Sequence, residues 1–142
     1  MTVVRIAQGS TLLLALLLLL LLFAVVPPLN LLLSRTTRAG AAALAAVQAR
    51  YLAESGIYEA RFGRFAGVRL PSCPPPAWPP PETVTVQGEV LGTLTAGRVR
   101  PGVYCARGRT AGGPLNYGAE VEVTLEVRFD GRGRILGWKE NP

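Results

Sequence analysis

An uninterrupted apolar run near the start of the chain constrains its architecture most. From Ile6 to Ser34 the sequence carries no charged residue, and 14 of its 22 leucines lie between Leu12 and Leu33. As a helix, these 22 residues would be about 33 Å long, which matches the roughly 30 Å hydrocarbon core of a bilayer. The sequence therefore predicts a membrane-spanning helix followed by a polar, basic head.

The same run could instead belong to a cleavable secretory signal, with Arg5 before it and small residues near Ala39-Gly40-Ala41 after it. Its length exceeds the roughly 7–15 apolar residues of such a signal, which favours a retained anchor. Arginines flank the run on both sides, so charge does not define its orientation. Two cysteines in a small domain rich in Pro and Gly favour an oxidising compartment. We therefore expect a single-pass membrane protein with an extracytoplasmic C-terminal head.

The composition argues against an enzyme. The 142 residues include no histidine, a single aspartate (Asp130) and two cysteines. Such a chain has little from which to build a catalytic triad, and two cysteines alone cannot complete a structural zinc site. A phosphate-binding loop and a dinucleotide fingerprint are also missing. We expect no catalytic residues, no metal and no cofactor, and therefore a structural or binding role.

An alanine-rich, helix-favouring stretch follows the apolar run over residues 37–62 and is expected to end near Gly63. Whether Pro27 and Pro28 bend one long helix or end a first one stays open. Larger apolar residues recur in the stretch at spacings of three, four and their sums, which predicts a narrow stripe covering one face of the head. The stripe consists of Leu44, Val47, Tyr51, Tyr58, Phe62 and Phe65.

This arrangement resembles the type IV pilin superfamily over residues 1 to about 62. Gly9-Ser10 lies directly before the apolar run, as the glycine of a prepilin peptidase site does. The segment from Gln48 to Ala60, QARYLAESGIYEA, is similar to the Ala-Glu-Ser/Ala-Gly-Ile/Val segment of some minor pilins and pseudopilins. The resemblance implies cleavage between Gly9 and Ser10, an N-methylated Ser10, and an α+β fold in which a long N-terminal helix packs on a small antiparallel sheet.

The implied partners are other pilin-like subunits, the prepilin peptidase, a membrane assembly platform and membrane lipid. Three residues depart from the family pattern: Gln8 replaces Lys or Arg, Ser10 replaces Phe or Met, and Leu14 replaces the usual glutamate. That glutamate pairs with a neighbouring N-terminal amine in major pilins, so its loss implies a minor pilin or a tip-type pseudopilin. Two alternatives stay open: a single-pass anchored domain outside any filament, and a secreted β-domain freed from its leader.

The head begins with a proline-rich connector. Seven of the eleven residues from Pro71 to Pro81 are proline, which favours an extended polyproline II conformation. Cys73 and Trp78 are expected to anchor this segment, although such a segment could also dock in an aromatic-lined groove. A disulfide between Cys73 and Cys105 would close a loop of about 32 residues and contribute roughly 3–4 kcal/mol.

Alternating apolar and polar residues predict strands over residues 83–90, 98–105, 119–129 and 134–139. Residues 130–133, Asp-Gly-Arg-Gly, predict a hairpin turn between the last two strands. The apolar residues of the third predicted strand should pack on the helix stripe: Val121, Val123, Leu125, Val127 and Phe129. The expected segments are a leader (1–9), a membrane helix (10–33), an amphipathic helix (34–65), the connector (66–82) and the sheet head (83–142).

Four arginines stand within twelve residues that contain no acidic residue: Arg98, Arg100, Arg107 and Arg109. Such a cluster could contact phosphates, and the resemblance to pilins makes DNA a possible partner. An ordinary solvated strand face is the alternative, because arginine outnumbers lysine by 14 to 1 across the whole chain.

Overall fold

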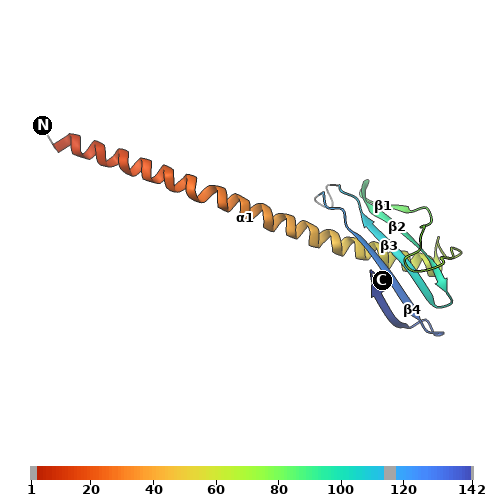
Figure 1. Cartoon of the computed structure of the whole chain (residues 1–142). Coiled ribbons are helices and arrows are strands. Elements are labelled where there is room, and N and C mark those ends of the chain that lie inside the picture. Colours follow the sequence, from red (N-terminus) through yellow and green to blue (C-terminus); the bar gives the residue numbers. More distant parts are fainter. Residues whose placement is uncertain (1–2, 114–117, 142) are drawn as a thin grey trace. The chain divides into compact units, whose positions relative to one another are not determined.

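A computed structural model describes residues 3–113 and 118–141, with side-chain surroundings from residue 12 onward. The chain divides into two units, residues 1–39 and 40–142, and each is described by itself. One helix, α1 (Val3–Phe62), contributes to both units (Figure 1). In the second unit α1 packs on a five-stranded antiparallel sheet, which confirms the predicted α+β fold class.

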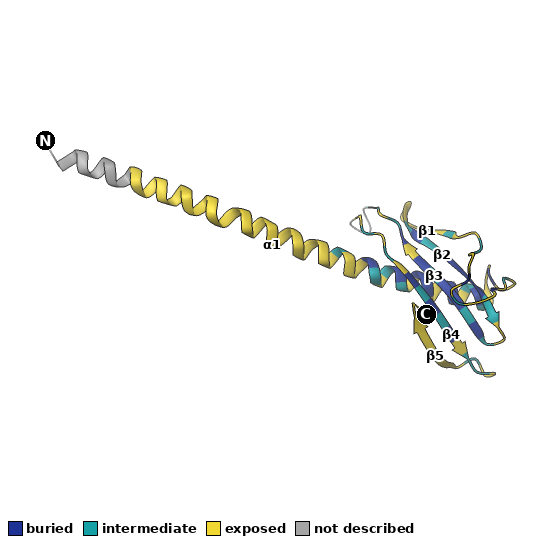
Figure 2. Ribbon diagram, in the orientation of Figure 1, coloured by how far each residue is buried: buried dark blue, intermediate teal, exposed yellow. Residues whose placement is uncertain are grey.

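The first unit is a helical segment of α1 with an exposed apolar surface. The large apolar side chains from Leu12 to Leu33 are between 43% and 74% exposed (Figure 2). The helix includes both Pro27 and Pro28, so the prolines do not end it. By length and composition alone, this helix is suited to cross a membrane.

The sheet of the second unit is a meander in which consecutive strands are neighbours. Its strands are β1 (Glu82–Val86), β2 (Glu89–Arg100), β3 (Val103–Thr110), β4 (Glu122–Phe129) and β5 (Ile135–Glu140). The predicted strands over residues 119–129 and 134–139 correspond to β4 and β5. The other two strand predictions, 83–90 and 98–105, were wrong because each range spans a hairpin turn.

Those two turns depend on backbone conformations that alternation does not reveal. Gln87 and Gly88 connect β1 to β2 with φ angles of 53° and 84°. Pro101 and Gly102 connect β2 to β3, and Gly102 has a φ of 75°. A β-carbon on Gly102 would also lie 2.8 Å from the carbonyl oxygen of Phe129. Glycine meets both requirements, because it adopts positive φ readily and lacks a side chain.

The face of α1 that covers the sheet differs from the predicted stripe. Five of the six predicted stripe residues are exposed, and only Phe65, which follows the helix, is buried. The expected contact between this stripe and the sheet was therefore wrong. Small and aliphatic side chains make the contact instead: Ala45, Ala49, Leu52, Ala53, Ile57 and Ala60. On the sheet, Val123, Leu125 and Val127 face the helix as predicted, and Val121 and Phe129 pack at the margin of this core.

Alanine and glycine at several positions of this contact allow the backbones of helix and sheet to approach each other. Gly108 of β3 lies so close to α1 that an added β-carbon would overlap the carbonyl oxygen of Ala49 and lie 2.5 Å from the amide nitrogen of Ala53. A β-carbon on Gly56 of α1 would lie 3.0 Å from that of Ala106. Tyrosine or phenylalanine side chains would not fit at this separation, so the aromatic residues lie on the other face of the helix.

The proline-rich connector lies against the opposite face of the sheet. Cys73 and Cys105 form the predicted disulfide, with their Cα atoms 5.7 Å apart. The hydroxyl of Thr95 donates to the carbonyl oxygen of Pro79 over 3.1 Å, and the Arg107 guanidinium lies 4.9 Å from the Trp78 ring. Cys105 and Arg107 alternate along β3 with Ala106, which faces α1. The sheet is therefore covered by α1 on one face and by the connector on the other.

The β4–β5 turn is organised by the carboxylate of Asp130. One of its oxygens accepts the backbone N–H groups of Arg132 and Arg134, each over 2.8 Å, and the other accepts Nε of Arg134 over 2.9 Å. These contacts lower the pKa of Asp130, with the backbone N–H of Arg134 as the largest cause. The ionised carboxylate therefore stabilises the predicted hairpin.

Asp130→Ala should lower the thermal stability of the full chain at neutral pH. Because the folded-state pKa lies below the unfolded value, the carboxylate contributes stability above about pH 4, and this contribution is lost as the pH falls through the folded-state pKa. Thermal melts of both proteins across that range should therefore converge in acid. Glu89→Ala is the control, because the described residues place no ion-pair partner by Glu89. A melting difference that persists unchanged in acid would contradict the assignment to the charge.

Candidate functional site

One candidate site in the second unit is the exposed apolar face of α1. We call Leu44, Val47, Tyr51, Tyr58 and Phe62 the aromatic stripe; their side chains are 41–66% exposed. At about 100° per residue the five positions fall within about 60° of the helix circumference. The rings of Tyr58 and Phe62 lie 5.4 Å apart. Since the sheet occupies the opposite side of the helix, no large part of the stripe is covered by the residues that the structure describes, and it has the form of a contact surface.

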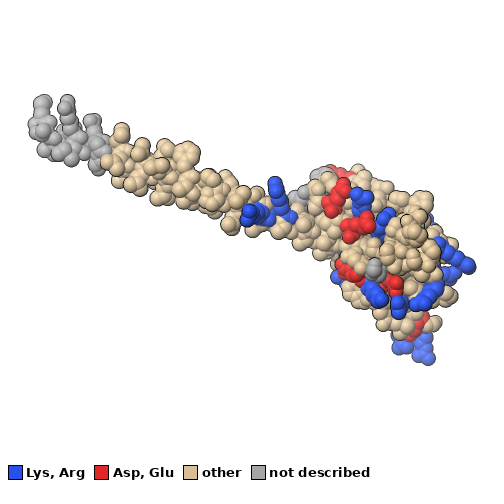
Figure 3. Space-filling model, viewed as in Figure 1, with Lys and Arg blue, Asp and Glu red and all other residues tan. Residues whose placement is uncertain are grey.

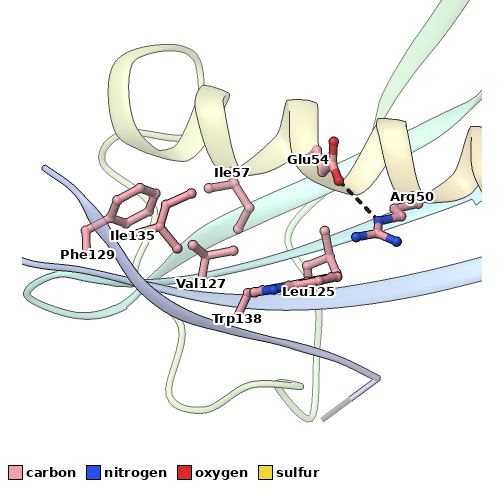
Figure 4. A pocket seen from close by; sticks show the side chains of 8 residues that line it. All are labelled: Arg50, Glu54, Ile57, Leu125, Val127, Phe129, Ile135 and Trp138. Carbon is pink, nitrogen blue, oxygen red and sulfur yellow. Dashed lines mark hydrogen bonds and ion pairs between the residues drawn. The ribbon is translucent and has the colours of Figure 1, made fainter.

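A groove beside the stripe is lined by residues of α1, β4 and β5 (Figure 4). Its volume is about 340 Å³, and its floor consists of the buried side chains of Ile57, Leu125 and Val127. Ile135 and Trp138 form the β5 wall and are 64% and 50% exposed. The remaining lining residues are Arg50, Glu54 and Phe129.

Arg50 closes one side of this groove through three contacts. Its Nε lies 3.2 Å from Oε1 of Glu54, its guanidinium lies 4.4 Å from the Trp138 ring, and its Nη1 lies 3.9 Å from Oε2 of Glu140. The groove therefore combines an apolar floor with a charge that its neighbours already compensate. Such a site suits an apolar side chain of a protein partner better than a charged small molecule.

The predicted processing site, Gly9 and Ser10, lies within α1, and its side-chain surroundings lie outside the described residues. The four arginines that the sequence analysis grouped together do not form one patch. Nη1 of Arg107 lies 3.8 Å from Oε1 of Glu122, and Nη2 of Arg109 lies 3.0 Å from Oε2 of Glu120. Arg98 and Arg100 lie at the other end of the β2–β3 pair, next to its hairpin turn.

Sequence reasoning missed the groove and the exposure of the stripe. The spacing of small residues was a usable signal for the helix face, because Ala45, Ala49, Ala53, Gly56 and Ala60 recur every three or four positions. The wall formed by Ile135 and Trp138 had no comparable signal, since a register irregularity at Arg128 and Phe129, which alternation does not reveal, places these two residues opposite Phe129 and Val127 of β4. Among the described residues, no group of three His, Cys, Asp or Glu side chains could hold a metal ion.

No family model, curated protein or solved structure matches the chain. Its function is therefore inferred from the fold and from the surfaces described above.

Proposed function

We propose that this chain is a minor pilin-like or tip-type pseudopilin subunit of a type IV pilus or type II secretion-type filament. The observation that carries the proposal is the aromatic stripe, five apolar side chains exposed on the face of α1 opposite its own sheet. Residues 34–43 separate this stripe in sequence from the apolar run and include Arg35 and Arg38. A neighbouring helix is the partner that matches a narrow apolar stripe of this kind.

The subunit is anchored by residues 12–33 with its head outside the cytoplasm, and it enters the filament through contacts along α1. The Cys73–Cys105 disulfide supports an oxidising compartment for the head. A prepilin peptidase acts between Gly9 and Ser10, and a membrane assembly platform inserts the subunit. Leu14 supplies no carboxylate for the terminal amine of a neighbour, which supports a minor rather than a bulk role.

Mass spectrometry of the N-terminus of the mature protein tests this proposal. We expect the chain to start at Ser10 with a methylated amine. Retention of residues 1–9 would overturn the filament role and favour a single-pass anchored domain. A start near Ala41 would overturn it in favour of a secreted β-domain.

Tyr51→Asp should reduce incorporation into sheared filaments about tenfold, because a charge in the centre of the stripe has to be desolvated against a neighbouring helix. Quantitative immunoblots of filament and membrane fractions measure the ratio. Thr85→Asp adds the same charge at an exposed position of β1 and should leave the ratio unchanged. Equal incorporation of both variants would show that the stripe is not an assembly surface.

A further inference from the structure

The arginines of the second unit fall into two groups according to their partners. Six of eleven have a carboxylate oxygen within 4 Å: Arg50, Arg64, Arg107, Arg109, Arg128 and Arg134. The other five have no such partner among residues 12–113 and 118–141. We call these five the arginine cluster: Arg61, Arg69, Arg98, Arg100 and Arg132.

The arginine cluster lies at one end of the sheet although its members come from four chain segments. Arg69 forms a parallel bridge with Arg98, whose carbonyl oxygen accepts the backbone N–H of Leu70 over 2.9 Å. Arg100 is two residues further along β2, at the start of the β2–β3 hairpin. These three arginines therefore share the hairpin end of the sheet.

The other two arginines, Arg61 and Arg132, lie at the same end of the sheet, next to Phe129 and the β4–β5 turn. The backbone N–H of Phe129 donates to the carbonyl oxygen of Gly102 in the β2–β3 turn over 2.7 Å. The Arg61 guanidinium lies 4.0 Å from the Phe129 ring, and its Nη2 lies 3.1 Å from where a β-carbon of Gly133 would stand. Arg132 directly precedes this glycine. In Figure 3 the blue atoms of the head form several separate groups, with red atoms between some of them.

The acidic side chains near the cluster are engaged elsewhere. Asp130 binds Arg134 and the backbone of its own turn. The carboxylate of Glu59 accepts the backbone N–H of Arg64 over 2.8 Å at the end of α1. Five arginines at one end of the sheet therefore have no carboxylate partner within 4 Å among the described residues, and an array of this kind attracts polyanions.

We propose that the arginine cluster binds the phosphate backbone of double-stranded DNA without sequence preference. A duplex carries about one charge per 1.7 Å of its axis, so several arginines can contact one molecule at once. The planar guanidinium also suits two phosphate oxygens at a time. The cluster consists of side chains from the last turn of α1, from turns and from strand ends, and it inserts no helix into a groove, so it reads no bases. This activity goes beyond filament assembly and can be measured on the purified chain.

The structure changes the set of residues predicted from the sequence. The proposed phosphate-binding set keeps Arg98 and Arg100 from the sequence prediction and adds Arg61, Arg69 and Arg132. The set no longer includes Arg107 and Arg109, because Glu122 and Glu120 already compensate their charges. The pair Arg100 and Arg132, which lacks carboxylate partners among the described residues, can thus be compared with the pair Arg107 and Arg109, which has them.

The test is fluorescence anisotropy of a labelled short duplex with the full chain in a neutral detergent, over a salt series from about 50 to 200 mM. Arg100→Gln/Arg132→Gln should weaken binding at least tenfold and reduce the salt slope by about 2, since each phosphate contact contributes about 0.9. The control, Arg107→Gln/Arg109→Gln, removes the same charge and should change binding less than about twofold. Arg69→Gln/Arg98→Gln should repeat the loss, and thermal melts check that each variant is folded.

Three results would overturn the proposal. Equal losses in the test and control variants would mean that net charge alone attracts the DNA. Binding that does not change with salt would not be phosphate recognition. Stronger, Arg100- and Arg132-dependent binding to vesicles containing phosphatidylglycerol than to the duplex would assign the cluster to a membrane surface. None of these results depends on whether the N-terminus is processed or the chain enters a filament.

Discussion

Gly108→Ala should destabilise the head by about 3 kcal/mol or more and lower its Tm by more than about 12 °C. The added methyl group would overlap the carbonyl oxygen of Ala49 and lie 2.8 Å from the β-carbon of Leu52. Both atoms are fixed by the α1 backbone, so a rotamer change cannot relieve the overlap. The helix has to move away from the sheet, and the core loses contacts along its length. Thermal and denaturant melts of the full chain in detergent measure the loss.

Gly137→Ala is the matched control, because it makes the same substitution in β5, where a β-carbon would have no heavy atom within 4 Å. It should leave the Tm unchanged or raise it slightly, since alanine restricts the unfolded chain more than glycine does. Similar melting temperatures for the two variants would contradict the close approach of α1 to β3.

Removal of the disulfide should have the second large effect. Cys73→Ala/Cys105→Ala is expected to cost about 3–4 kcal/mol, because the bond closes a 32-residue separation in the unfolded chain. In the folded state it also ties the connector to β3 next to the contact between Trp78 and Arg107. The connector should then become accessible to proteases before the sheet unfolds.

A reductant separates the role of the bond from that of the side chains. The wild-type chain in reductant should melt close to the double variant, whereas the double variant should not respond to reductant. A wild-type Tm that is the same with and without reductant would show that the bond does not stabilise the head.

The fold class was predictable because two patterns of apolar residues are strong, one continuous and one alternating. The apolar run indicated the first part of α1, and the alternation from Val121 to Phe129 indicated β4 and its inward face. The Asp130 turn followed from its residue types, and the disulfide followed from there being only two cysteines. In each case the residue types of a short segment favour the conformation or bond that this segment has in the folded chain.

The face of α1 could not be predicted in the same way. Burial of Tyr51 and Tyr58 would remove more apolar area from water than burial of Ala49 and Ala53, yet the separation between helix and sheet is set by Gly108 in a distant strand. Similarly, the partners of Arg107 and Arg109 depend on the register between β3 and β4. The sequence places Glu120 and Glu122 more than ten residues away from these arginines, so only the folded sheet separates compensated from uncompensated charges.

The alanine- and glycine-lined contact between α1 and the sheet also affects how this chain can diverge. Alanine and glycine positions inside the contact tolerate almost no enlargement, whereas the bulky residues of the aromatic stripe contribute little to the stability of the head. Substitutions in the stripe can therefore change the exposed surface of α1 without a cost in folding. Variation among descendants of this protein should accordingly concentrate on its largest apolar side chains, the reverse of the usual pattern for an amphipathic helix.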